Sequence, residues 1–397
     1  MAPEHDKSQF PSKPRFWNDA KVRAIVFQVL VSLGVAGFLI YTTYNTLHNM
    51  EARGISTGFG FLSRPAGFGI AQTLIEYTEA ESTYGRTFVV GLLNTILVSG
   101  LGVILATILG FIIGVARLSK NWLIAKLAEA YIEIFRNIPL LLQILFWYFA
   151  VFLALPEIND AIRIGEATYL SRRGLYTPSP VFESGFSWTL WSAVAAIVGA
   201  VVLIRWAHRR QELTGQRFPA YLVSLALVIG LPALAFYISG RPLSWEVPER
   251  GAFDFSGGFA LIPELAALLV GLSVYTAAFI AETVRAGILA VSHGQSEAAY
   301  ALGLRPSWTL RLVVIPQSMR VAVPPLTSQY LNLTKNSTLA TAIGYPDLFA
   351  VFAGTTLNQT GQAVEVISMT MAVYLTISLL ISLFMNWYNT RMALVER

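Results

Sequence analysis

The sequence predicts an all-α polytopic membrane protein with about eight transmembrane helices. Hydrophobic residues make up 55% of its 397 residues and charged residues only 13%. A soluble domain carries about a quarter charged residues, so this chain is too apolar to be one. The mean hydropathy of +0.57 agrees. The apolar residues also gather in runs of about the 20 residues that a helix needs to cross a bilayer.

The apolar runs define the expected spans. The first run follows a polar stretch of 23 residues and is longer than a signal-peptide core, so we expect a retained transmembrane helix. In the second run, Gly110 and Gly114 have the GxxxG spacing that lets membrane helices pack closely. The expected spans cover about residues 24–47, 88–116, 138–155, 188–204, 219–238, 261–291, 319–340 and 366–387.

The connecting segments are more polar. Residues 48–87 are rich in Gly and Phe in their middle, and both an interfacial loop and a flexible linker remain open for them. Further polar stretches lie at 156–187, 239–261 and 341–365. The expected short loop before the third span carries four cations, Arg117, Lys120, Lys126 and Arg136.

The distribution of Lys and Arg predicts the orientation. If the N-terminus is cytoplasmic, the inner segments hold nineteen of the 28 cations and the outer segments eight. Because cytoplasmic loops are enriched in Lys and Arg, both termini are expected inside. The same charges account for the sequence pI of about 9.3 without a nucleic-acid partner.

Several enzyme classes lack their sequence signals. The chain has no cysteine, and its four histidines are scattered without metal-ligand spacing. It contains no Gly-Lys dipeptide and therefore no phosphate-binding loop that ends in Gly-Lys-Ser/Thr. Neither a GxSxG nor an HExxH motif is present. We expect no bound cofactor or metal and no enzymatic activity in this chain.

The polar segment from Gln295 to Pro316 separates two strongly apolar runs. Ser292 and Gln295 have the spacing of a capping box, which predicts a helix start. Gly303 is placed to end that helix in a left-handed conformation. Pro306 suits the first turn of a second short helix, which we expect Pro316 to interrupt.

The same segment resembles the EAA loop of the membrane subunits of ABC importers. The resemblance rests on Glu-Ala-Ala at 297–299, Gly303 six residues after the glutamate, and a hydrophobic-x-hydrophobic-Pro ending at Pro316. In that family the loop docks on the ATPase subunit. The resemblance therefore implies ATPase-coupling roles for Glu297, Ala298, Ala299, Gly303, Leu304, Arg305 and Pro316.

Two further stretches resemble polar amino-acid permeases. One is Tyr275 to Leu304, and the other is Glu133 to Gln143, where Asn137 and Ile138 depart from the usual Gly and Thr. The extra helices resemble the larger permeases of the general L-amino-acid transport system. The implied core is the five-helix type I importer permease.

The resemblance divides the chain into four parts. The core occupies 86–155 and 262–397, and its coupling loop covers 292–316. Residues 1–85 add a cytoplasmic tail, a helix and a periplasmic loop, and residues 156–261 add periplasmic loops and a helix pair.

The family also implies partners. These are a second permease subunit, sister or identical, an ATPase dimer that holds ATP and Mg²⁺, a periplasmic amino-acid-binding protein, and the lipid bilayer of the bacterial inner membrane. The outer segments 156–187 and 341–365 are expected to contact the binding protein, or else only to connect helices. An ion-gradient-driven secondary transporter or channel for small polar solutes stays open as the alternative.

Ionisable groups inside apolar runs are candidates for the solute pathway. A carboxylate at Glu282 and an ammonium at Lys335 can receive the two charged ends of an amino acid. A structural role also remains open, in which Glu282 pairs with Arg285 and Lys335 caps backbone carbonyls. The expected pathway set is Glu282, Lys335, Asn336, Ser337 and Thr338.

Overall fold

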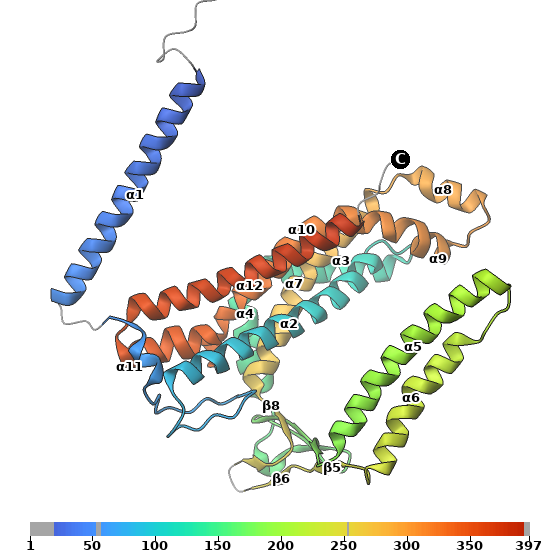
Figure 1. Cartoon of the computed structure of the whole chain (residues 1–397), viewed down its shortest axis with the longest axis horizontal. Helices are drawn as coiled ribbons and strands as arrows, with labels where there is room; N and C mark the ends of the chain where they lie inside the picture. The colour runs from blue at the N-terminus through green and yellow to red at the C-terminus, as the bar shows by residue number, and fades with distance from the viewer. Residues whose placement is uncertain (1–19, 53–56, 252–253, 393–397) are drawn as a thin grey trace, which may run out of the picture.

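A computed structural model describes residues 20–52, 57–251 and 254–392. Its central helix is α7, Pro263–Leu289 (Figure 1). Two helices pack against α7: α2, Tyr84–Ala116, and α10, Ile315–Asn336. A further helix, α12, Ala363–Met392, packs on α10. Most of the apolar length of α7 is buried, with Leu268, Leu272 and Ile280 fully enclosed. These helices form the membrane core expected from the sequence.

The helices α2 and α7 meet through glycine. A Cβ atom added at Gly110 would lie 2.6 Å from the Cβ of Ile280, and one at Gly114 would lie 2.7 Å from the carbonyl oxygen of Ala281. Only glycine permits so close an approach of two backbones. The packing role of the GxxxG spacing is therefore confirmed.

The expected short loop after α2 is instead a helix, α3, Trp122–Asn137. It begins because the Asn121 side chain accepts hydrogen bonds from the N–H groups of Leu123 and Ile124, at 2.9 and 3.3 Å. It ends because Pro139 restricts Ile138 to an extended conformation. There the chain bends by 105° into α4, Leu140–Leu145, and the π-helical η3, Phe146–Phe152.

The number of spans is close to the prediction. Within the described ranges, six helices are long and apolar enough to cross a membrane, or seven if the bent α3–α4 unit counts as one span. The remaining expected span, α10, is long enough at 22 residues, but polar residues and three prolines lower its hydropathy. The first helix, α1, Ala20–Ala52, has none of its apolar window buried.

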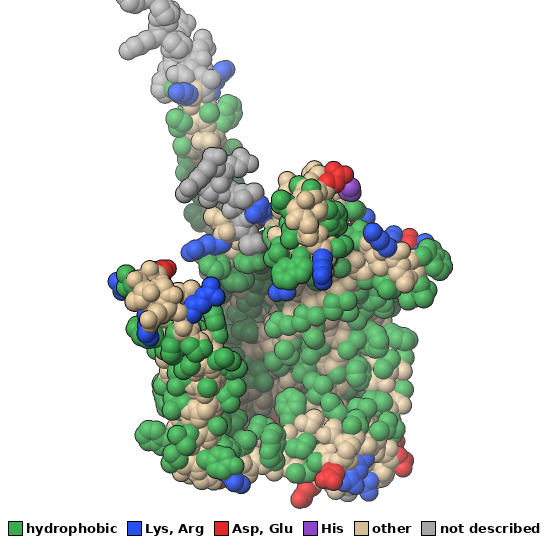
Figure 2. All heavy atoms as spheres, turned by 90° about the vertical axis from the view of Figure 1, so that its right-hand side faces the viewer, with side chains coloured by type: hydrophobic (Ala, Val, Ile, Leu, Met, Phe, Trp, Pro, Cys, Tyr) green, Lys and Arg blue, Asp and Glu red, His purple; other side chains and the backbone are tan. Residues whose placement is uncertain are grey.

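The inserted helix pair forms a hairpin that stands apart from the core (Figures 1 and 2). It consists of α5, Phe186–Thr214, and α6, Ala220–Ile238. Small residues make its inner face, and the Ser224 hydroxyl lies 3.5 Å from the carbonyl oxygen of Ala200. Large apolar side chains such as Trp188 and Leu222 are exposed, as expected for a surface that lies in lipid.

The insertion also adds strands to the predicted helical fold. Four short antiparallel strands lie in the order β1-β2-β3-β8: β1, Ile162–Ile164; β2, Thr168–Ser171; β3, Gly174–Thr177; and β8, Phe259–Leu261. Two strand pairs accompany them: β4, Ser179–Phe182, with β5, Leu243–Glu246, and β6, Glu249–Arg250, with β7, Phe255–Ser256.

A small polar and aromatic core holds these strands together. Tyr176 packs against Phe255, with the ring centroids 4.6 Å apart, and donates a hydrogen bond to Asp254 Oδ1 at 2.9 Å. Burial and the neighbouring carboxylate raise the pKa of Tyr176, so its hydroxyl keeps the proton that it donates. The insertion is thus a folded unit and not a set of open loops.

Residues 57–83 cover the end of α2 nearest the strands. They include the 3₁₀ helix η2, Phe59–Ser63, whose Phe61 is fully buried beside Phe352. The Arg86 guanidinium donates two hydrogen bonds to the carbonyl oxygen of Glu76, at 2.9 and 2.7 Å. The linker interpretation is therefore wrong for this part. Residues 53–56 lie outside the described residues.

The expected outer loop 341–365 is mostly helical and packed into the core. It contains η6, Ser337–Ile343, the π-helical η7, Phe349–Thr356, and α11, Leu357–Thr360. Tyr345, Leu348 and Phe352 are fully buried. This segment therefore exposes less polar surface than its sequence suggested.

The two ends of the molecule differ in charge. The strands lie at one end, which we call the sheet end (Figure 1). The α5–α6 turn and two loop helices, α8, His293–Ala301, and α9, Pro306–Thr309, lie at the other end, which we call the coupling end. Figure 2 shows an apolar band between the ends and Lys and Arg side chains concentrated at the coupling end.

Candidate coupling segment and solute pathway

Residues 292–316, which we call the coupling segment, start with α8, His293–Ala301. The expected capping box does not form, because the Ser292 side chain makes no capping hydrogen bond. The Gln295 side chain instead accepts a hydrogen bond from Gln317 Nε2 at 3.1 Å. This contact ties α8 to α10.

The end of α8 is as predicted. Gly303 has a φ of +79°. The N–H of Leu304 donates to the carbonyl of Ala299 at 3.1 Å, and the N–H of Gly303 donates to that of Tyr300 at 2.9 Å. This is the Schellman pattern, in which a left-handed glycine closes the last turn.

The second helix does not stop at Pro316. It runs from α9, Pro306–Thr309, through the π-helical η5, Leu310–Val314, into α10. A proline inside an α-helix removes one hydrogen bond and collides with the carbonyl four residues earlier. Since the π segment changes the bonding register just before Pro316, the proline sits in the first turn of α10 and the helix continues.

The residues of the coupling segment differ in exposure. Glu297, Ala298, Gly303 and Arg305 are exposed, Leu304 and Pro316 are half-buried, and Ala299 is buried in its own chain. Glu297 Oε1 lies 3.0 Å from His293 Nδ1. Leu302 is 82% exposed. The turn between α8 and α9, which we call the elbow, therefore presents small and partly apolar side chains on its outward surface, where a partner can reach them.

Glu282 lies in a cavity of about 330 Å³ between α3, α7 and α10. Both nitrogens of the Arg285 fork contact its carboxylate, at 2.5 and 3.0 Å. The expected Glu282–Arg285 pair is thus confirmed. Arg136 reaches the same cavity from α3, with its guanidinium carbon 5.3 Å from the centre of the Phe279 ring.

Lys335 lines a different cavity, of about 520 Å³, beside η7 and α12. Within the described part of the chain its ammonium has no ion pair or hydrogen bond, so the expected capping of carbonyls by Lys335 is not seen. The following hydroxyls bond back along the helix: Ser337 to the carbonyl of Thr334, and Thr338 to that of Lys335, both at 2.8 Å. Asn336 is half-buried. Glu282 and Lys335 therefore do not share one cavity.

The structure contains a buried polar cluster that was not predicted from the sequence. Asp347 is fully buried, accepts a hydrogen bond from the N–H of Ala350 at 2.8 Å, and accepts another from the Tyr374 hydroxyl at 3.2 Å. Asn94 donates to the carbonyl oxygens of Gln72 and Pro346, both at 2.9 Å. The acidic residue ahead of the apolar run 348–353 is a helix-capping signal that was available.

The comparisons with known proteins fit this arrangement. Residues 106–394 match the family described as binding-protein-dependent transport system inner membrane component. The chain belongs to this permease family. Its helical core is therefore that of a membrane permease of an ATP-driven importer, and the ion-gradient alternative is not supported.

Three relatives of this permease cover nearly its whole length. It is 55% identical to a putative amino-acid ABC transporter permease of Escherichia coli, YhdX, over 99% of this chain and 100% of the relative. It is 51% identical to the general L-amino acid transport system permease AapQ of Rhizobium johnstonii, over 96% and 94%. It is 44% identical to the glutamate/glutamine/aspartate/asparagine permease BztB of Rhodobacter capsulatus, over 96% of both.

Proposed function

We propose that this permease imports L-amino acids that a periplasmic binding protein delivers. It works with a second permease subunit, sister or identical, and with an ATPase dimer that binds ATP and Mg²⁺. The amino-acid class is supported by the names of three relatives that match over at least 94% of their length. The location is the bacterial inner membrane, with both termini cytoplasmic.

The coupling segment carries this proposal. Gly303 fixes an elbow between two short helices, and the exposed residues of that elbow lie at the end that is rich in Lys and Arg. Cationic ends of membrane proteins face the cytoplasm, where ATP is available. A rigid elbow transmits a movement of the ATPase to α7 and α10, the two core helices on either side of it.

The decisive experiment is reconstitution with the partner subunits. The permease is expected to copurify with an ATPase, and uptake of labelled amino acid into proteoliposomes is expected to stop when that ATPase carries an inactivating substitution. Uptake that continues without ATP and follows an imposed ion gradient would overturn the proposal.

The solute pathway is proposed to pass two charged sites. Lys335, with Asn336, Ser337 and Thr338, marks the first, and Glu282 marks the second, nearer the coupling end. An amino acid carries a carboxylate and an ammonium group. The Lys335 ammonium at the first site can bind the carboxylate, and the Glu282 carboxylate at the second site can bind the ammonium group. The cavities at the two residues are about 520 and 330 Å³, which falls within the usual size range of small-molecule sites.

The binding protein is proposed to dock at the sheet end. The strands there form a compact unit at the opposite end from the coupling segment. Arg163, Glu166 and Arg250 are among its exposed charged residues. Of the two segments first expected to make this contact, 156–187 offers more surface than 341–365, much of which is buried.

A further inference from the structure

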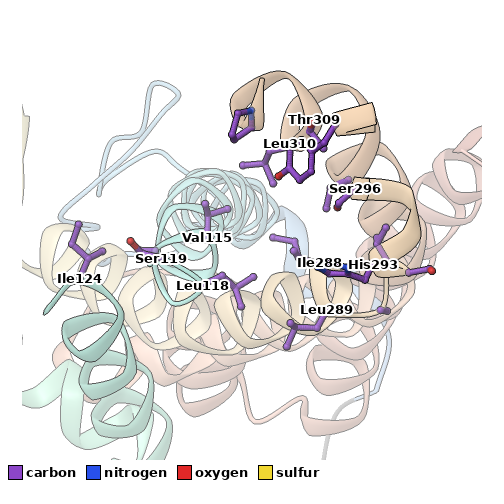
Figure 3. Close-up of a pocket in the computed structure, with 17 residues that line it drawn as sticks. Val115, Leu118, Ser119, Ile124, Ile288, Leu289, His293, Ser296, Thr309 and Leu310 are labelled. Atoms are coloured by element: carbon purple, nitrogen blue, oxygen red, sulfur yellow. The ribbon is translucent and has the colours of Figure 1, made fainter. Parts of the chain in front are cut away.

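A cavity of about 770 Å³ lies behind the coupling helices. Figure 3 shows Thr309, Leu310, Ser296 and His293 on the coupling segment around it, and the ends of α2 and α7 on its other side. Its wall is formed where those two spans end, at Ala116 and Leu289. It therefore opens at the depth where acyl chains meet lipid headgroups.

The lining of this cavity has two chemically different sides. The membrane side is apolar: Val115, Leu118, Ile124, Ile288 and Leu289. The coupling side presents hydroxyl groups from Ser292, Ser296 and Thr309. A ligand that fits both sides has an apolar part and a polar part.

Thr309 gives an independent indication of a ligand. Its side chain is 1% exposed, and its hydroxyl oxygen has no hydrogen-bond partner among the described residues. An unpaired buried hydroxyl costs about 1–3 kcal/mol, so such groups normally have a partner. Because Thr309 lines the cavity, a ligand bound there can supply this partner after a small rotation of the side chain.

Four cationic residues are direct sequence neighbours of residues that line the cavity, although none of the four lines it. Arg117 follows Ala116 directly, Lys120 follows Ser119, Arg305 precedes Pro306, and Arg311 follows Leu310. Arg117 pairs with Glu129 at 3.3 Å, whereas Lys120 has no ion pair in the part of the chain that the structure describes. The surroundings therefore favour an anionic headgroup.

We propose that this cavity binds an anionic phospholipid of the cytoplasmic leaflet. One acyl chain lies along the apolar side, and the phosphate faces the hydroxyls and the flanking cations. The lipid fills the space between the coupling elbow and the ends of α2 and α7. It stiffens the elbow, because the elbow otherwise spans an unfilled cavity.

The test measures lipid binding to the purified full-length permease, without its partners. Phosphatidylglycerol and phosphatidylcholine of matched acyl chains are added to delipidated protein and counted by native mass spectrometry. Tighter retention of phosphatidylglycerol is expected, and this preference is expected to weaken with salt. Equal retention of both lipids would overturn the proposal.

Two substitutions locate the site. Thr309→Val keeps the shape and removes the hydroxyl, so phosphatidylglycerol affinity is expected to fall about tenfold, the usual loss for a hydrogen bond to a charged group. Ser296→Leu fills the cavity and is expected to abolish the tight binding. Thr376→Val makes the same chemical change at an exposed position on α12 and is expected to have no effect.

A further pair of variants separates the headgroup from the acyl chain. Lys120→Gln with Arg311→Gln is expected to remove the preference for phosphatidylglycerol while phosphatidylcholine binding stays the same. Unchanged lipid binding in both Thr309→Val and Ser296→Leu would overturn the site. A crosslink from Ser296→Cys to the ATPase in the assembled complex, with no lipid retained there, would assign the cavity to that protein instead.

Discussion

Replacing Gly110 with alanine tests how α2 is held against the core. The added Cβ would lie 2.6 Å from the Cβ of Ile280 and 2.9 Å from the carbonyl oxygen of Ala277. Carbon atoms in favourable contact are about 3.5–4.0 Å apart, so one of the two helices has to move. Ala277 contributes backbone, which moves only if α7 itself shifts. Overpacking of this kind costs about 1–3 kcal/mol.

The helix propensity of alanine partly hides this cost. Exchanging glycine for alanine inside a helix gains about 0.8–1.0 kcal/mol. Gly100 provides the control because it lies in the same helix, is exposed, and has no heavy atom within 4 Å of an added Cβ. Gly100→Ala therefore receives the gain alone. The free energy of unfolding of the two variants is expected to differ by about 1–3 kcal/mol, which is the overpacking cost itself.

The assay is unfolding of the purified permease in mild detergent by a denaturing detergent, followed by circular dichroism. Gly100→Ala is expected to be at least as stable as the unsubstituted protein, and Gly110→Ala less stable than Gly100→Ala. Equal free energies of unfolding for the two variants would refute the inference that α2 and α7 pack through this glycine.

Four other predictions follow from the structure. Gly303→Val forces a branched residue to a φ of +79° at a cost of about 1–3 kcal/mol, so ATP hydrolysis without transport or poor assembly is expected, while Gly303→Asn, which tolerates this conformation, keeps coupling. Lys335→Gln and Glu282→Gln are expected to change the ratio of acidic to basic amino-acid uptake about tenfold, as for a lost charge-assisted hydrogen bond; equal loss for all substrates with poor assembly would show a purely structural role. Asp347→Ala removes two hydrogen bonds and is expected to cost about 1–3 kcal/mol in detergent unfolding, more than Asp347→Asn, which keeps an acceptor oxygen. A short Gly-Ser linker in place of residues 161–172 removes β1 and β2 and leaves β3 paired with β8. This change is expected to abolish stimulation of ATP hydrolysis by the binding protein. Full stimulation would show that this edge of the sheet does not contact the binding protein.

The sequence alone predicted the features that depend on local chemistry. Apolar runs located the helices, because a bilayer requires long apolar segments whatever their neighbours are. The left-handed cap at Gly303 was predictable because only glycine adopts that conformation at little cost. The Glu282–Arg285 pair was also predictable, since residues three apart on a helix face each other.

Features that depend on distant partners needed the tertiary structure. The Gln295 side chain bonds Gln317 and not the helix start, because a contact 22 positions away in sequence competes with the local cap. Pro316 does not end its helix, because a π segment changes the register ahead of it. Residues 341–365 read as a polar loop but are partly buried, because Asn94 and Tyr374 from other helices satisfy polar groups of this segment.

The membrane fold and the coupling elbow were thus determined by hydrophobic length and backbone conformation, which are properties of consecutive residues. The separation of Glu282 and Lys335 into different cavities was decided only by how the helices pack. Helix packing follows from side-chain shape across the whole bundle, and no stretch of sequence contains that information by itself.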